Sequence, residues 1–312
     1  MKLKQENINH FYFKNFRDLA RAISLVENDN PGGEELLKTI FEYTGKAYRI
    51  GVTGPPGAGK STLVSQMVKR YRLERLKIGV IAVDPTSPYS GGALLGDRIR
   101  MIDLINDPGV FIRSMATRGS LGGLSNKAQD VADLMDAAGM DLVIFETIGV
   151  GQGELDIAKT TDTTLVVLVP ESGDSIQAMK AGLMEIADIF VVNKSDRDGA
   201  EKMKIELEMM LQLKSADSEW LPPIINTIAN MGEGIIELQS MVDKHKKTII
   251  EKGILKDKKS QRALEKIKEV IKLKLEQDFW DKERTQLLDQ QLPQVLIRNL
   301  SPYQLAEELF RK

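Results

Sequence analysis

The sequence predicts an α/β fold with a mostly parallel central sheet, a helical N-terminal lead-in and a helical C-terminal extension. Five short segments that are apolar on both faces alternate with helix-length stretches: RIGVTG (49–54), KIGVIAVD (77–84), LVIFETIG (142–149), TLVVLVP (164–170) and IFVVNKSD (189–196). Buried strands separated by helices are typical of βαβ units, which build a parallel sheet. Polar motifs lie at or just after the ends of several of these strands, where such sheets bind their ligands.

Helical segments precede and follow the predicted sheet domain, which covers residues 46–245. In residues 1–45, apolar side chains recur at helical spacing before a break at NPGG (30–33): Phe16, Leu19, Ile23 and Val26. In residues 246–312, a charge-rich sequence carries a second helical stripe: Leu264, Ile267, Ile271 and Leu275. This stripe fits an internal packing face and a dimerisation element equally well, so both interpretations stay open.

Composition and charge narrow the class of protein. Hydrophobic residues make up 42% of the 312-residue chain and charged residues 28%, which is ordinary for a folded protein in water. Lys and Arg number 43 against 45 Asp and Glu, so we expect neither nucleic acid nor a membrane as a partner. No apolar run approaches the roughly 20 residues that span a bilayer. The N-terminus lacks signal-peptide features and the chain lacks cysteine, so we expect a cytoplasmic protein.

The strongest motif is GPPGAGKS at residues 54–61, which matches GxxxxGK[ST] between a predicted strand and a predicted helix. Its backbone N–H groups can surround phosphates, and the following helix adds the positive end of its dipole. We expect Lys60 to reach the β- and γ-phosphates and the Ser61 hydroxyl to ligate Mg²⁺. The motif predicts a P-loop NTPase with one run of nucleotide-binding residues: Gly57, Ala58, Gly59, Lys60, Ser61 and Thr62.

The sequence NKSD at the end of the fifth predicted strand matches the NKxD pattern that reads guanine, through Asn193, Lys194 and Asp196. A carboxylate can accept hydrogen bonds from the ring N–H and the 2-amino group of guanine, whereas adenine has no donors in that arrangement. Alone, such a segment is often a turn or a helix cap. Together with the P-loop it favours GTP over ATP, and predicts hydrolysis of GTP to GDP with Mg²⁺.

Acidic residues after other strands are candidates for the metal shell. Glu146 follows the strand LVIF, in a glycine-containing segment that can act as a switch beside the γ-phosphate. Asp84 ends the second predicted strand, and Asp97 lies in the polar stretch after it. Either aspartate could complete the magnesium shell or position the attacking water. The alternative is that both are caps or solvated loop residues.

These residues resemble the MeaB/ArgK/MMAA family of P-loop GTPases, which are chaperones of adenosylcobalamin-dependent acyl-CoA mutases. The resemblance is carried by TGKAYRIGVTGPPGAGKSTL, VDPTSPYSGGALLGDRIRM, ATRGSLGGLS, ETIGVGQGELDIA and NKSD, and extends to SPYQLAEELF near the C-terminus. It implies a GTPase that gates cofactor loading and protects a mutase, with methylmalonyl-CoA mutase the expected partner. The C-terminal helices suggest a homodimer. The resemblance also implies that Asp84, Asp97 and Glu146 surround the metal and water.

The resemblance further marks residues 171–182 as similar to the family's third switch. Asp174 and Lys180 are then the residues that approach the nucleotide when a mutase is bound; without the resemblance, the stretch reads as a helix start with an exposed lysine. The chain departs from the family pattern at NTIANMG (226–232), where relatives carry a Ser-Ala pair. We therefore expect guanine contacts there to come from the backbone.

Two other functions are compatible with a P-loop. A nickel-delivery GTPase needs soft or imidazole ligands, and this chain has no cysteine and only His10 and His245. A kinase that phosphorylates an amino acid or a protein is not excluded by the P-loop itself. Analysis of the products distinguishes these classes, because a hydrolase releases free phosphate and a kinase labels an acceptor.

Overall fold

The structure is a computed structural model that describes residues 13, 15–85, 102–117, 123–147, 153–170, 182–214 and 220–311. The chain forms two compact units, Met1–Lys258 and Lys259–Lys312. Within the described ranges, no helix has both the length and the apolar character needed to cross a membrane.

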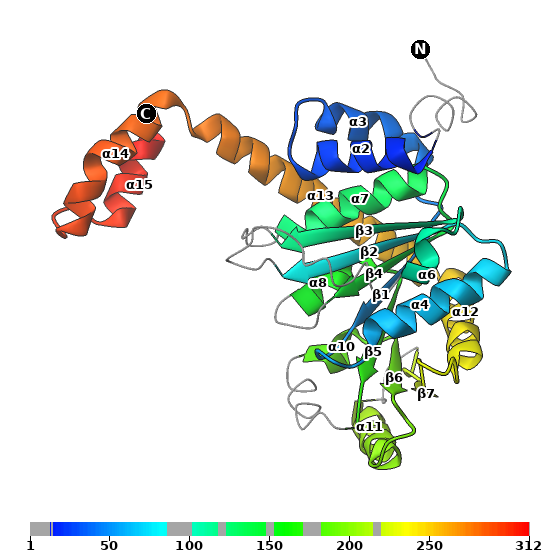
Figure 1. Cartoon of the computed structure of the whole chain (residues 1–312). Helices are drawn as coiled ribbons and strands as arrows, with labels where there is room; N and C mark the ends of the chain where they lie inside the picture. Colours follow the sequence, from blue (N-terminus) through cyan, green and yellow to red (C-terminus); the bar gives the residue numbers. More distant parts are fainter. Residues whose placement is uncertain are drawn as a thin grey trace. The chain divides into compact units, whose positions relative to one another are not determined.

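In the described part of the first unit, the core is a seven-stranded sheet in which every neighbouring pair of strands is parallel (Figure 1). The strand order is β3-β2-β4-β1-β5-β6-β7. The strands have the following bounds: β1 Tyr48–Thr53, β2 Ile78–Pro85, β3 Val110–Thr117, β4 Leu142–Thr147, β5 Thr163–Leu168, β6 Ile189–Asn193 and β7 Ile224–Thr227. The sheet confirms the predicted α/β fold and its parallel strands.

Strands β3 and β7, at the two edges of the sheet, have no counterpart among the five predicted strands. β3 interrupts its apolar residues with Arg113, whose guanidinium forms an ion pair with Glu27. β7 has only four residues, of which two are buried. Edge strands are covered less completely than central ones, so their sequences carry a weaker apolar signal.

Helices cover both faces of this sheet. In the first unit the helical elements begin and end as follows: α2 Phe16–Glu27, α3 Gly33–Ile40, η1 Phe41–Tyr43, α4 Lys60–Leu73, α6 Ile102–Ile105, α7 Gly123–Ala137, α8 Gly153–Thr160, α10 Met184–Ile186, α11 Ala200–Lys214 and α12 Ile235–Glu251. The helices α2, α3 and α7 lie on one face, and α4 and α12 lie on the other (Figure 1). The predicted helical lead-in is therefore confirmed as α2 and α3.

Strand β5 shows why the central strands read as continuous apolar runs. Leu165 and Val167 belong to the apolar cluster beneath α4 and α12, whereas Val166 and Leu168 belong to the cluster beneath α11. Successive side chains of a strand point to opposite faces, so a strand covered on both faces is apolar at every position.

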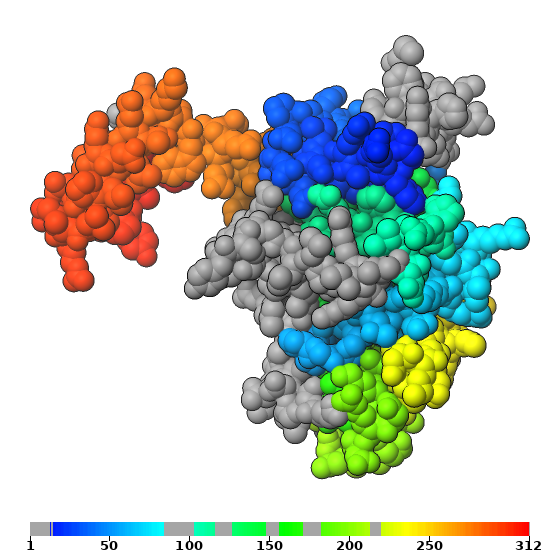
Figure 2. Space-filling view, in the orientation of Figure 1, coloured from blue at the N-terminus to red at the C-terminus, as the bar shows by residue number. Residues whose placement is uncertain are grey.

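Helices α4 and α12 are joined by polar contacts as well as apolar ones. Arg70 Nε donates to Gln239 Oε1 at 2.8 Å, and Gln239 Nε2 donates to the Glu74 carboxylate at 2.5 Å. Figure 2 shows the two helices side by side on one face, α4 in light blue and α12 in yellow. These contacts hold in place the helix that follows the GPPGAGKS motif.

The second unit consists of helices, as the sequence predicts for the C-terminal extension. The last three helices have these bounds: α13 Ile254–Phe279, α14 Lys282–Leu296 and α15 Pro302–Arg311. Arg284 of α14 donates to the Leu309 carbonyl at 3.0 Å and to the Phe279 carbonyl at 3.1 Å, which ties α14 to both neighbouring helices. The predicted apolar stripe lies on α13, where its side chains are 45% to 65% exposed: Leu264, Ile267, Ile271 and Leu275.

One ion pair of the first unit predicts a pH-dependent contribution to stability. Arg72 Nη2 of α4 lies 2.8 Å from the Asp107 carboxylate, which also accepts from the Gly109 backbone N–H at 2.7 Å. The hydrogen bond from Arg72 holds the pKa of the Asp107 carboxyl below its ordinary value of 3.8, although burial opposes this. A lowered folded-state pKa gives stability that is present above the unfolded pKa and is lost as pH falls through the folded value.

We expect Asp107→Asn to lower the free energy of unfolding by about 1 kcal/mol near neutral pH, because both partners are partly exposed and the pair is screened. Below a pH of about 3.8, the parent also loses this stabilisation and the difference should shrink. Urea unfolding of both proteins across this range measures it. An equal loss at every pH would show that the charge of Asp107 is not the cause.

Candidate functional site

The carboxyl ends of β1, β4 and β6 bring the predicted motifs together. The P-loop connects the last residue of β1, Thr53, to the first residue of α4, Lys60. Its first residue, Gly54, has φ +134°, and a Cβ atom there would collide with the Val167 carbonyl oxygen of β5. Glycine is therefore required at this turn, both for its backbone angles and for the close approach of β5.

The start of α4 offers backbone donors to an anion. Gly59 precedes the helix with φ +83°, and among the described residues no side chain caps the helix. The first N–H groups of an α-helix have no partner within the helix, and the helix dipole places partial positive charge there. A Cβ at Gly59 would also collide with the Asn193 side chain. This end of the helix can therefore receive a phosphate group.

Lys60 places its ammonium group over the same loop. Its Nζ donates to the Gly54 carbonyl at 2.8 Å and to the Pro55 carbonyl at 2.9 Å, and the residue is 6% exposed. These two acceptors are neutral carbonyl oxygens, and charged phosphate oxygens would be stronger acceptors for this cation.

Ser61 and Glu146 meet between α4 and β4. The Ser61 hydroxyl donates to Glu146 Oε1 at 2.5 Å, and both residues are buried. A hydroxyl and a carboxylate are the hard oxygen ligands that Mg²⁺ prefers, so the donor set fits this ion. Asp84 lies near the end of β2, one strand away, but its side chain is outside the described part of the chain.

The NKSD segment is bound directly to the P-loop. Asn193 Nδ2 donates to the Ala58 carbonyl at 2.8 Å, and Lys194 Nζ donates to the Gly57 carbonyl at 2.9 Å. Asn193 Oδ1 accepts from Thr227 Oγ1 and from the Ala229 N–H, both at 3.1 Å. Asn193 therefore joins the P-loop to the end of β7.

Asp196 follows at the solvent-exposed end of this turn. The turn before it is held in place because Ser195 N and Ser195 Oγ both donate to the Thr227 carbonyl at 3.1 Å. Lys194 adopts a left-handed conformation with φ +57°, which reverses the chain directly after β6. This arrangement leaves the Asp196 carboxylate accessible to a base.

The structure shows two further pairs of contacts in this region that sequence patterns do not predict. Thr227 and Ala229 orient Asn193 through the bonds just described. Thr147 Oγ1 donates to Thr53 Oγ1 at 3.0 Å, joining the ends of β4 and β1 in a buried position. Threonine is common in strands for steric reasons, so a signal for these roles appears only once the strand order is known.

Three of the predicted site residues lie outside the described residues: Asp97, Asp174 and Lys180. The described residues contain no group of three or more metal-binding side chains. His245, one of the two histidines considered for nickel, is 1% exposed, and its Nδ1 lies 2.7 Å from Thr163 Oγ1. This histidine is engaged inside the fold.

Comparison with known proteins identifies the family. The family model described as "Methylmalonyl Co-A mutase-associated GTPase MeaB" matches residues 19–284. The chain belongs to the MeaB family of GTPases. The match includes the P-loop, Glu146 and NKSD, so the predicted P-loop GTPase and its family are both confirmed.

Two similar proteins are named GTPases, and one solved structure has a similar fold. A putative GTPase from Pyrococcus abyssi is 52% identical over 258 residues, 82% of this chain and 80% of that protein. GTPase ArgK from Escherichia coli is 39% identical over 255 residues, 79% of this chain and 77% of ArgK. A crystal structure of a protein named LAO/AO transport system kinase has a TM-score of 0.71 and 29% identity, and 99% of each chain is covered.

Proposed function

We propose that this GTPase is a chaperone of an adenosylcobalamin-dependent acyl-CoA mutase, with methylmalonyl-CoA mutase the expected partner. The observation that carries the proposal is the family match over residues 19–284, since the family is described by its association with that mutase. In this account, GTP binding and hydrolysis gate the loading of the cofactor and protect the mutase. The cytoplasm is the proposed location, which fits the absence of cysteine.

The nucleotide lies across the P-loop and the NKSD turn in this proposal. Residues 57–62 bind the phosphates, and Lys60 exchanges the Gly54 and Pro55 carbonyls for phosphate oxygens. Asp196 accepts from the guanine N–H groups, while Asn193 and Lys194 keep its turn attached to the loop that holds the phosphates. The two motifs thus bind the two ends of GTP as one connected unit.

Mg²⁺ is assigned to Ser61 and Glu146, with Asp84 and Asp97 as the further acidic residues. When bound, the ion neutralises charge on the phosphate oxygens. The protein's own contribution is to hold the Ser61 hydroxyl and the Glu146 carboxylate together at 2.5 Å behind the P-loop. Asp97 is the residue proposed to orient the attacking water, and the reaction yields GDP and phosphate.

We also infer that the protein is a homodimer. The support is the stripe of Leu264, Ile267, Ile271 and Leu275, which is exposed on α13 in the second unit. Apolar residues repeated along one helix face are normally covered, and a second α13 would cover them.

For the proposed regulation, we expect intrinsic GTP turnover to be slow. A bound mutase then accelerates it through Lys180. The P-loop itself carries one cation, Lys60, so a second cation has to come from another segment. In other GTPases a delivered arginine raises the rate by about 10³ to 10⁵, and a lysine should give less because it lacks the bidentate fork. Asp174, in the same segment, is proposed to approach the nucleotide together with Lys180 when the mutase is bound.

The experiment compares GTP turnover of the parent and Lys180→Ala with and without purified mutase. We expect the mutase to stimulate the parent at least roughly tenfold and to leave the variant near its basal rate. Equal stimulation of both proteins would remove Lys180 from the mechanism and make Arg98 or Arg118 the next residue to test. A fall in basal turnover alone would show that the lysine acts without the partner.

A further inference from the structure

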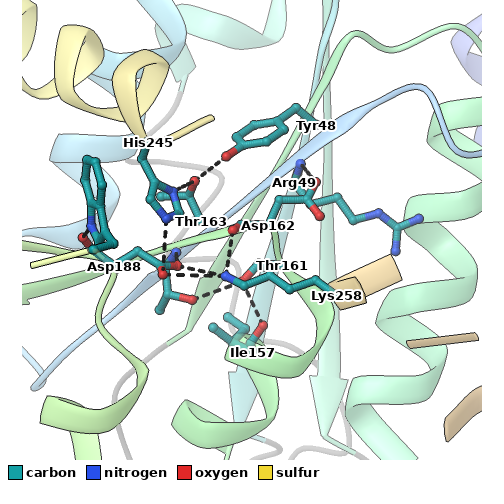
Figure 3. A network of polar contacts seen from close by, with 11 residues as sticks. Tyr48, Arg49, Ile157, Thr161, Asp162, Thr163, Asp188, His245 and Lys258 are labelled. Atoms are coloured by element: carbon teal, nitrogen blue, oxygen red, sulfur yellow. Dashed lines mark hydrogen bonds and ion pairs between the residues drawn. The ribbon is translucent and has the colours of Figure 1, made fainter. Parts of the chain in front are cut away.

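A buried polar cluster, drawn in Figure 3, lies at the amino ends of the inner strands β5 and β6. The nucleotide motifs lie at the carboxyl ends of the strands, so the cluster is separate from them. It forms where β5 and β6 begin, and includes Thr163, the first residue of β5, and Asp188, which directly precedes β6. His245 of α12 lies between them and is 1% exposed. Its Nδ1 is 2.7 Å from Thr163 Oγ1, and its Nε2 is 3.4 Å from Asp188 Oδ1.

Polar contacts join Tyr48, Thr163, His245 and Asp188 in a row. If His245 donates from Nε2–H to Asp188, its Nδ1 can accept from the Thr163 hydroxyl. Thr163 Oγ1 in turn accepts from the Tyr48 hydroxyl, 2.5 Å away. Burial raises the pKa of the Tyr48 phenol, which therefore remains a donor. With this arrangement, the Tyr48 hydroxyl, the Thr163 hydroxyl and the His245 N–H each donate in the direction of the Asp188 carboxylate.

Lys258 of α13 supplies the cation on the other side of Asp188. Its Nζ lies 3.3 Å from Asp188 Oδ2 and donates to the Asp162 carbonyl at 2.9 Å (Figure 3). The backbone N–H of Thr164 also donates to Asp188 Oδ2, at 2.8 Å. A buried carboxylate needs hydrogen bonds or a nearby cation to offset the loss of its hydration. For Asp188, these contacts come from the sheet, α12 and α13.

Lys258 lies in the first turns of α13, close to the boundary between the two compact units. Helix α13 begins at Ile254 after Gly253, whose φ of +78° allows the sharp turn from α12. Ile254 and Leu255 are partly buried and pack against the apolar core shared by the sheet, α4 and α12. Lys258 is the last residue of the first compact unit. From Lys259 onward the same helix belongs to the second unit.

We propose that Asp188, His245 and Lys258 form a latch that fixes the first turns of α13 to the sheet. The apolar anchor at the start of α13 is small, because Ile254 and Leu255 are only partly buried. Lys258, one turn further along the helix, adds a polar anchor to this apolar contact. Without this ion pair, the first turns of α13 lose their polar contact with the sheet and open more often.

Hydrogen exchange in the full-length protein tests the latch. Lys258→Met keeps most of the side-chain length and removes the charge, and Lys256→Met makes the same change at an exposed position two residues earlier. We expect exchange of the α13 amides after Lys258 to quicken about tenfold in Lys258→Met and to be unchanged in Lys256→Met. Lys258→Arg keeps the charge and should preserve the protection.

A second readout comes from Trp220, whose Nε1 donates to the Asp188 carbonyl at 2.7 Å and whose ring lies 4.8 Å from that of His245. With Trp280 replaced by Phe, the fluorescence of Trp220 should change in Lys258→Met and not in Lys256→Met. Faster exchange confined to α13, with β1 and β4 protected as in the parent, supports the latch. Exchange equal to that of Lys256→Met, or faster exchange throughout the sheet, overturns it.

Discussion

Lys60→Ala is expected to abolish nearly all GTP turnover, by at least about 10²-fold in kcat. The ammonium group of Lys60 is buried over the P-loop between the Gly54 and Pro55 carbonyls. Without it, no other described side chain of the loop carries positive charge to the β- and γ-phosphates. The fold should survive, because the apolar core beneath α4 does not depend on this side chain.

Release of free phosphate from GTP measures this effect. Lys69→Ala is the matched control, since Lys69 lies on the same helix, is 43% exposed and pairs with Asp103. Parental turnover in Lys60→Ala would mean that the P-loop assignment is wrong. The same assay examines the kinase alternative, because phosphate that appears on an acceptor instead of in solution would identify a transferase.

Asp196→Asn is expected to lose GTP and to gain xanthosine triphosphate. In the proposed complex the carboxylate accepts from the guanine 2-amino group, whereas an amide can donate to the 2-oxygen of xanthine. A site that hydrogen-bonds its substrate can discriminate against an analogue that lacks this bond by up to ~10⁴. Because Asn193 and Lys194 hold the turn to the P-loop by their own bonds, the substitution should change base preference without displacing the phosphates.

Competition between GTP and xanthosine triphosphate for binding measures the change in base preference. Asp198→Asn provides the control, because Asp198 is also exposed and lies two residues further along. If Asp196→Asn binds GTP as tightly as the parent, a different residue reads the base.

The fold was predictable from sequence where local pattern and tertiary burial agree. The central strands are apolar at every position because helices cover both faces, and this is what a sequence window detects. The edge strands β3 and β7 lack that signal: Arg113 of β3 forms an ion pair with Glu27 of α2, and β7 has only four residues. Their recognition depends on neighbours that are distant in sequence.

The candidate site divides in the same way. The P-loop and NKSD are local motifs whose chemistry can be read directly. Their connection is not local, since the bond from Asn193 to the Ala58 carbonyl joins residues 135 positions apart. The latch is hidden for the same reason, because His245 and Lys258 belong to charge-rich helices and gain their roles only when β5 and β6 lie beside them.

The central proposal is that this GTPase is a chaperone of a mutase. Affinity capture tests this proposal most directly. The protein is loaded with a nonhydrolysable GTP analogue and incubated with extract of the native organism, and retained proteins are identified by mass spectrometry. Lys60→Ala, which should not hold the nucleotide, is the control. We predict that an adenosylcobalamin-dependent acyl-CoA mutase is retained by the parent and not by the control. Absence of any such mutase, while the parent still binds the analogue, would contradict the proposed function.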